Sequence, residues 1–520
     1  MEKTTGTNRR SQVGLLLCVM LTGCTVGPKY HPPAVQPPPA FKEAPPPGPT
    51  SNPPQAQPNN QANGTQDNTT ETWTVAQPAD AKIRGDWWAI FNDPQLNSLE
   101  VQAVAANQDI QVAITKLEQA RAQARIAVAG LYPQANTGPD IGRGSEPGNR
   151  PFNPPSSPAT TLTSSTFEIP FTINWEPDFF GRIRRNIESL QASYQASGAD
   201  LANVRLTIAA EVGADYFTLR QLDTQIAVLD RTVASFERGL QLVENRQQGG
   251  VASGLDVAQE QTLLDGTRTQ AILLRQQRAQ YEDAIAVLIG QPAPTFRLPF
   301  GEISARLPVI PSGVPSDLLE RRPDVAEAER QMAAANAQIG VAMAAYYPSF
   351  PISLGGGFES FSLTNLVNAN STFWAVGVSA FETIFTGGAR RAQVQYQQAG
   401  YQGTIATYRG TVLNAFREVE DSLAGLAVLD QAEKTQAAAV ADARKALDIA
   451  TNRYTGGLVN YLDVITAQQT LLSNESLAAQ LDGERLVTSV QLVKALGGGW
   501  DASSIAALKV KPSIKQAVEP

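Results

Sequence analysis

Residues 452–471 read NRYTGGLVNYLDVITAQQTL, and a related stretch, NRQQGGVASGLDVAQEQTLL, occupies residues 245–264. The two stretches start 207 positions apart and share an Asn-Arg pair, a Gly-Gly pair and a Leu-Asp-Val triplet. In each stretch a long helical pattern stops at the paired glycines, and a new helical pattern starts around the Asp. Glycine supplies the positive φ at which a helix can end, and a carboxylate is favoured at a helix start. The chain is therefore predicted to be an internal duplication with one helical hairpin in each copy. The paired glycines at the two predicted tips are Gly249, Gly250, Gly456 and Gly457.

The N-terminus has the pattern of a bacterial lipoprotein signal. Three basic residues precede a short apolar run at residues 13–20, and the sequence Leu21-Thr22-Gly23-Cys24 follows. This pattern predicts a signal peptide over residues 1–23, with cleavage before Cys24. Cys24 would then carry N-acyl (palmitate-type) and S-diacylglycerol lipid, and Thr25 after it favours sorting to the outer membrane. The alternative, an uncleaved transmembrane helix, needs about 20 apolar residues, roughly twice the number present.

Composition and periodicity divide the rest of the chain. Residues 24–72 form a Pro-rich tether that cannot bury a core. The first structural repeat is expected over residues 73–310, the second over 311–497, and a C-terminal tail over 498–520. Helices are predicted over 94–129, 182–245, 255–290, 323–345, 388–453 and 462–496. The two longest would each be roughly 95–100 Å in length, at 1.5 Å per residue.

In four segments apolar and polar residues alternate with a period of two, which predicts strands. They lie near residues 135–143, 163–175, 349–359 and 373–384. In the second segment the odd positions from Phe167 to Trp175 are apolar, while most even positions are polar, as in a strand that crosses a membrane. Four strands cannot close a barrel, and an open edge is not tolerated in lipid. Two copies would give eight strands with a filled interior, whereas three give twelve strands and a lumen. The expected fold is mainly α with a membrane β-barrel: duplicated long helical hairpins form a trimeric α-barrel, and each chain contributes four strands to a shared 12-stranded β-barrel.

Three motifs, in order along the chain, carry a resemblance to a known family. They are Cys24-Thr25-Val26-Gly27-Pro28-Lys29-Tyr30, then Trp87-Trp88-Ala89-Ile90-Phe91-Asn92-Asp93-Pro94-Gln95-Leu96, then Glu320-Arg321-Arg322-Pro323-Asp324. Together with the duplication, they resemble the outer membrane factor family of tripartite efflux systems, the TolC-, OprM- and NodT-like lipoproteins. The resemblance covers residues 24–520. It implies a homotrimeric channel in the outer membrane, extending through the periplasm to a periplasmic adaptor (membrane fusion) protein and an inner-membrane RND-type transporter.

The resemblance also implies roles for residues at the second tip. It places Tyr454 and Asp463 at the constriction that closes the periplasmic end. The family member best known for a hydrogen-bonded gate has an Arg where this chain has Val459, so closure is expected to depend on packing of Leu458 and Leu462. An alternative hypothesis is that Asp463 only stabilises the first turn of its helix, as Asp256 would in the first repeat. The tip glycines likewise have two readings, as docking points for the adaptor or as turn residues only.

Composition argues against several other classes of function. The single histidine, His31, lies in the tether, so a histidine general base, a Ser-His-Asp triad and a histidine metal site are not expected. There are 49 acidic and 41 basic side chains, a net charge of −8, which gives no basic excess for nucleic acid. The chain is expected not to be an enzyme and to need no cofactor beyond the lipid on Cys24. The alternatives are a lipid-anchored structural coiled coil of the periplasm and the channel of a type I protein secretion system. The sequence does not identify the transported substrate.

Overall fold

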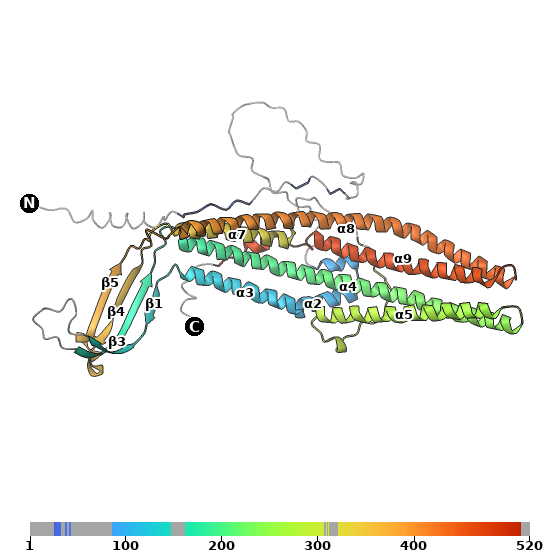
Figure 1. The fold of residues 1–520 in the computed structure, drawn as a ribbon, viewed down its shortest axis with the longest axis horizontal. Coiled ribbons are helices and arrows are strands. Elements are labelled where there is room, and N and C mark those ends of the chain that lie inside the picture. Colours follow the sequence, from blue (N-terminus) through green and yellow to red (C-terminus); the bar gives the residue numbers. More distant parts are fainter. Residues whose placement is uncertain are drawn as a thin grey trace, which may run out of the picture.

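The computed structural model describes residues 25–32, 37–38, 41–42, 86–146, 162–305, 308, 310 and 321–510. The predicted signal peptide, Cys24, most of the Pro-rich tether and residues 511–520 lie outside the described residues. The molecule is a long rod, with a β-sheet at one end and two helical tips at the other (Figure 1). No described helix has both the length and the apolar character needed to cross a membrane.

The element order repeats once, as the duplication predicts. The first repeat contains η1 (Trp87–Phe91), α2 (Pro94–Ala106), α3 (Gln108–Ala129), β1 (Gln134–Thr137), β2 (Asp140–Glu146), β3 (Leu162–Trp175), α4 (Arg182–Gln248), α5 (Gly254–Leu288) and η2 (Ala293–Thr295). The second contains α7 (Pro323–Ala344), β4 (Ile352–Ser360), η4 (Leu363–Asn365), η5 (Ala369–Ser371), β5 (Thr372–Val378), α8 (Ala389–Thr455) and α9 (Tyr461–Ala495), and α10 (Ser503–Ala506) follows it. The long helices α4 and α8 have 67 residues each, and α5 and α9 have 35 each. The helix predictions are therefore confirmed to within three residues at each end, with one exception.

The exception is the helix predicted over residues 94–129, which the structure divides at Asn107. This residue has extended backbone angles, and its side-chain oxygen accepts hydrogen bonds from the backbone N–H groups of Asp109 and Ile110. Its amide nitrogen also donates to the carbonyl of Leu288 at 2.8 Å. Asn competes with the helix by bonding to nearby backbone groups, so it ends α2 and caps α3.

The strand predicted near residues 135–143 is also divided. β1 and β2 pair with different parts of β3, and Gly138 and Pro139 lie between them. Proline has no N–H to donate to a strand ladder, which explains the interruption. The last predicted strand ends at Val378 rather than at residue 384, and beyond it only an isolated bridge joins Ser349 to Phe381. Because β1 and β2 occupy one position beside β3, the antiparallel sheet still has four positions, in the order β1/β2, β3, β4, β5.

The register of the sheet separates apolar from polar side chains. Trp175 lies opposite Ile352, which lies opposite Val378, and the next row on this face contains Ile173, Leu354 and Val376. The alternate rows contain Asn174, Ser353 and Gly377, and then Thr172, Gly355 and Ala375. Residues directly opposite one another share a face of the sheet. The sheet therefore has one apolar face and one face of small and polar residues, as the alternation predicts.

The segment after Cys24 is fastened to the helices near the sheet. The Val26 N–H donates to the carbonyl of Phe180, and the Arg185 guanidinium donates to the carbonyls of Val26 and Gly27. The Tyr30 hydroxyl donates to the Glu329 carboxylate. Because Phe180 lies between β3 and α4, these contacts fix the chain that leaves Cys24 at the junction of sheet and helices.

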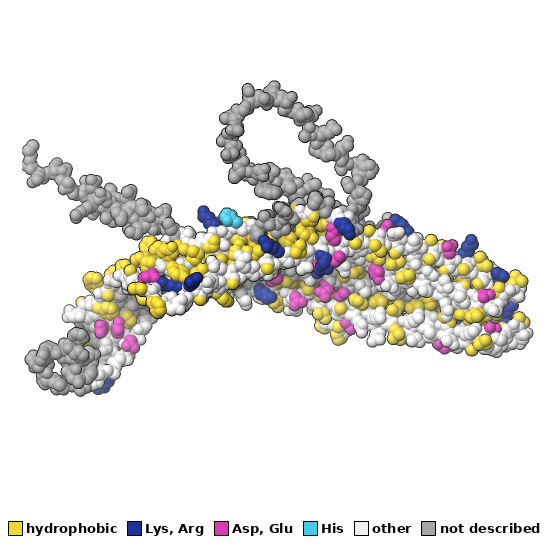
Figure 2. Space-filling view, turned by 45° about the horizontal axis from the view of Figure 1, so that its top comes forward, with side chains coloured by type: hydrophobic (Ala, Val, Ile, Leu, Met, Phe, Trp, Pro, Cys, Tyr) yellow, Lys and Arg dark blue, Asp and Glu magenta, His cyan; other side chains and the backbone are white. Residues whose placement is uncertain are grey.

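The helical rod has an apolar flank near the sheet. Hydrophobic side chains gather over the half of the rod closer to the strands, whereas the half that leads to the tips has dispersed charges and many uncharged polar side chains (Figure 2). Ile384 and Phe385, between β5 and α8, are 97% and 86% exposed in the single chain. Large exposed apolar surfaces of this kind are typical of lipid or protein contacts.

Candidate functional site: the two helical tips and the groove between them

The two tips have the same backbone geometry. Gly250 and Gly457 have φ values of 74° and 73°, while the glycine before each of them has a negative φ. The first residue after each glycine pair donates its N–H to the carbonyl of the tip arginine, Arg246 or Arg453. No atom lies within 4 Å of a Cβ built at either positive-φ glycine. The turn geometry therefore favours glycine, but the space around both positions is open.

The two aspartates that follow the tips differ in their contacts. In the first tip the Asp256 carboxylate accepts the N–H of Ser253 at 2.9 Å, and the Ser253 hydroxyl accepts the N–H of Asp256, which forms a capping box. In the second tip Asn460 is the cap, and its side chain accepts the N–H of Asp463 at 3.3 Å. Within the described part of the chain, the Asp463 carboxylate has no hydrogen-bond or ion-pair partner, and the residue is exposed. Of the two, only Asp256 caps its helix with its carboxylate.

Tyr454 lies between the two hairpins of its own chain. The residue is only 8% exposed, and its ring contacts that of Tyr461 at a centroid distance of 4.9 Å. The Arg246 guanidinium of the first tip lies 4.6 Å from the centre of the Tyr454 ring, and its Nη1 donates to the Tyr454 carbonyl at 3.1 Å. Burial raises the pKa of the Tyr454 hydroxyl, Arg246 acts in the opposite direction, and Asp256 adds to the rise. The structure therefore brings Tyr454 into contact with the first tip.

The remaining predicted gate residues are on the surface of the second tip. Leu458 and Leu462 are 73% and 51% exposed in the single chain. Val459, in contrast, packs against the small apolar cluster of Val243, Tyr454, Tyr461, Val464 and Ile465. Two exposed leucines and an exposed carboxylate on one tip are thus available for contacts with other copies of the chain.

Three residues at this site were not predicted from the sequence: Arg246, Tyr461 and Glu260. Arg246 supplies a cation at the junction of the hairpins. Position 459 of the second tip, which is Arg in the family member best known for a hydrogen-bonded gate, is Val in this chain. Glu260 is fully buried, and the Tyr461 hydroxyl lies near it. The sequence contained only two signals for these residues. One is the charged Arg246 in the last turn of α4, and the other is Glu260 at a position where the second repeat has Ala.

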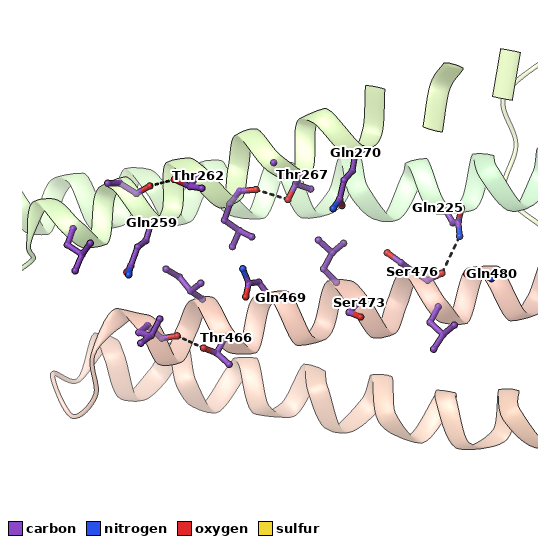
Figure 3. Close-up of a pocket in the computed structure, with 18 residues that line it drawn as sticks. Gln225, Gln259, Thr262, Thr267, Gln270, Thr466, Gln469, Ser473, Ser476 and Gln480 are labelled. Carbon is purple, nitrogen blue, oxygen red and sulfur yellow. Dashed lines mark hydrogen bonds between the residues drawn. The ribbon is translucent and has the colours of Figure 1, made fainter. Parts of the chain in front are cut away.

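A groove runs between the two hairpins behind the tips. It has a volume of about 1020 Å³, with walls from α5 and α9 and Gln225 of α4 among its lining residues. Gln259 and Gln469 point into it from opposite walls (Figure 3). The hydroxyls of Thr262 and Thr466 instead bond to carbonyls of their own helices. The lining consists of Gln, Thr, Ser and small or aliphatic residues, and it includes no charged side chain. Among the described residues, no cluster of three or more His, Cys, Asp or Glu side chains could hold a metal ion.

Comparison with known proteins identifies the family. The family model described as outer membrane efflux protein matches residues 99–291 and 314–498, which include most of both repeats. The chain belongs to the outer membrane efflux protein family. It is 33% identical over 433 residues to the pyoverdine export outer membrane protein OpmQ of Pseudomonas aeruginosa, an alignment that covers 83% of this chain and 90% of that protein. It is 31% identical over 490 residues to the toluene efflux pump outer membrane protein TtgI of Pseudomonas putida, which covers 93% and 97% of the two chains.

Solved structures agree with this assignment. The outer-membrane channel OprN has a TM-score of 0.78 at 26% identity, and the match covers 92% of this chain and 100% of that one. The fold predicted from the sequence, an α-barrel joined to a β-barrel, is the fold of this family. The protein is an outer membrane efflux channel that extends into the periplasm.

Proposed function

We propose that three copies of this outer membrane efflux channel form one conduit, which passively conducts substrates delivered by an RND-type inner-membrane transporter and a periplasmic adaptor protein. The observation that carries the proposal is the four-position sheet. Within the described residues, β1 and β2 pair only with β3, and β5 pairs only with β4, so both edges of the sheet are available to another chain. Unpaired strand edges are not stable in lipid, which requires the edges to pair with those of neighbouring copies.

The number of copies follows from the size of the barrel. Two copies would give eight strands, and side chains fill a barrel of that size. Three copies give twelve strands and leave an aqueous lumen lined by the polar face that contains Thr172, Asn174 and Ser353. The apolar face, with Trp175 and Val376, then meets lipid. A homotrimer also covers the apolar flank of the rod near the sheet.

The adaptor is proposed to dock at the tips and in the groove behind them. The tips combine the open glycine positions Gly249, Gly250, Gly456 and Gly457 with exposed apolar side chains. The groove between α5 and α9 is long and uncharged, which suits an incoming helix that buries small and uncharged side chains. The mature chain is proposed to be anchored by lipid on Cys24. The segment that follows, residues 25–32, supports this proposal because it is held at the junction of the sheet and the helices.

These observations argue against the structural coiled coil and, less strongly, against the type I secretion channel. A structural coiled coil gives no reason for a sheet with one apolar face. A type I secretion channel would use the same barrel, but the relatives are named for the export of pyoverdine and toluene, which favours small-molecule efflux.

Native mass spectrometry of the purified, detergent-solubilised protein tests the assembly. Three chains per particle are expected. A monomer or a dimer under conditions that preserve lipid adducts would contradict the proposal. Co-purification of an adaptor and a transporter of the RND type, rather than an ATP-driven exporter, would separate efflux from protein secretion.

A further inference from the structure

A fully buried carboxylate lies at the junction of the two hairpins. Glu260 of α5 has an exposed fraction of 0%. The Tyr461 hydroxyl is the polar group that acts on its carboxylate, and in the part of the chain that the structure describes Glu260 forms no ion pair. Buried carboxylates are usually paired with a cation, so a carboxylate in this position without one requires an explanation.

Gly239 of α4 makes room for this carboxylate. A Cβ at Gly239 would lie 2.5 Å from Oε1 of Glu260 and 3.1 Å from the Tyr461 hydroxyl oxygen. Both polar groups therefore lie against the same point on the α4 backbone. Since α4 and α5 form the first hairpin and Tyr461 begins α9 of the second, the carboxylate lies where the two hairpins meet.

The internal duplication provides a comparison within the same chain. Shifted by 207 residues, Gly239 corresponds to Ala446 and Glu260 to Ala467. The second hairpin therefore has an Ala–Ala pair where the first has Gly–Glu. The hairpin architecture does not require a carboxylate at this position, because the second copy forms without one.

The charges around Glu260 do not neutralise it. The charged and titratable groups that face this junction are Arg246 from α4, Asp256 from α5, Tyr454 from α8 and Tyr461 from α9. Arg246 is engaged by the ring and carbonyl of Tyr454. Burial raises the pKa of Glu260 to about 7, and the nearby Tyr461 hydroxyl opposes this rise to a smaller extent. The packed junction therefore favours the neutral carboxyl.

We propose that Glu260 is a pH switch between the hairpins: its neutral carboxyl keeps α5 packed against α4 and α9, and loss of its proton to solvent drives the hairpins apart. An ionised carboxylate at this position needs water, and water can reach it only when α5 separates from its neighbours. The separation widens the tip, so the inference rests on the proposed function as a channel for its physiological meaning.

The sign of the effect follows from the two pKa values. A hydrated carboxyl has a pKa of 4.5, and the packed one has a pKa of about 7. Below the hydrated value both states hold the proton, and pH has no effect. Between the two values a rise in pH increasingly favours the separated state, and above about 7 the effect is complete. The expected change in the ratio of separated to packed junctions is up to about 300-fold per chain.

Spin-label distances across the groove test the proposal. Labels attached through keto amino acids in place of Gln259 and Gln469 report the distance between α5 and α9 in the full-length protein. We expect a longer and broader distance distribution at pH 8 than at pH 5. Glu260→Gln should remain at the short distance at both values. The double variant Gly239→Ala/Glu260→Ala, which reproduces the pair of the second repeat, should also be insensitive to pH, whereas Asp265→Asn on the exposed face of α5 should respond like the parent.

Two results would overturn the switch. One is a parent distance that does not change between pH 5 and pH 8, and the other is a full pH response in Glu260→Gln. The double variant guards against the possibility that Gln at this position merely unfolds the tip. Because this measurement does not depend on conductance, failure of the switch can be distinguished from failure of the channel assignment, which planar-bilayer recording tests separately.

Discussion

Asp256 and Asp463 occupy equivalent positions in the two repeats but have different contacts. The Asp256 carboxylate belongs to a capping box, while the exposed Asp463 carboxylate has no partner in the described chain. In a trimer, three Asp463 carboxylates near the axis would interact with about 1 kcal/mol per pair in water at close approach. We predict that Asp463→Asn weakens cation preference and block by divalent or trivalent cations in single-channel recordings. Asp256→Asn should leave both unchanged and instead cost about 1 kcal/mol of local stability. Equal effects of the two substitutions on selectivity would leave Asp463 as a helix-start residue only.

Arg246 joins the first tip to the second through Tyr454. Arg246→Ala removes a cation–π contact of about 0.5–1 kcal/mol and a hydrogen bond of about 1 kcal/mol. We therefore expect the equilibrium constant for closing the tip to fall by a factor of roughly 13–30, observed as a higher frequency of open events in planar bilayers. Arg453→Ala at the equivalent position is the matched control, because Arg453 is exposed and, among the residues that the structure describes, forms no such contact across the hairpins. An unchanged open frequency in Arg246→Ala would show that this contact does not hold the tip closed.

Among the elements, substitutions of the tip glycines distinguish a role in turn geometry from a role in docking the adaptor. Leu at Gly250 or Gly457 costs about 1–2 kcal/mol because of the positive φ, but no atom within 4 Å would clash with its Cβ. We predict that both variants assemble normally and lose efflux, measured as drug or dye accumulation in cells at equal trimer abundance. Gly290 also has a positive φ of 70°, but there a Cβ would lie 2.4 Å from the Ala106 carbonyl oxygen. Gly290→Leu should therefore reduce the amount of folded protein. Loss of trimer in the tip variants as well would assign the tip glycines to structure alone.

The elements themselves were largely predictable. The 207-residue repeat, the period-two segments and the paired glycines located the hairpins and the strands, because these features depend on local periodicity and on φ. The interruption at Asn107 was missed because it depends on a hydrogen bond to the Leu288 carbonyl, which is distant in sequence. The contacts of Arg246 and Glu260 were missed for the same reason. They depend on how two hairpins are rotated against each other, which helical periodicity does not specify.

For the whole molecule, the proposed lipid anchor on Cys24 and the barrel would both hold the protein at the membrane. The segment at residues 25–32 is fastened to Phe180, Arg185 and Glu329, at the junction of the sheet and the helices. We predict that Cys24→Ser abolishes incorporation of radioactive palmitate while the protein remains partly in the membrane fraction, because the barrel itself is held by lipid. Label that persists on the variant would contradict the assignment of Cys24 as the lipidation site.

In the proposed assembly, identical chains share a single water-filled barrel that is restricted at the helical tips. Planar-bilayer recording of the purified protein tests it most directly. We predict discrete single-channel steps with a preference for cations, a low conductance for the parent, and a higher conductance for a variant in which Arg246 and Tyr454 are both replaced by Ala. The absence of discrete steps from a preparation that native mass spectrometry identifies as trimeric would contradict a shared water-filled barrel.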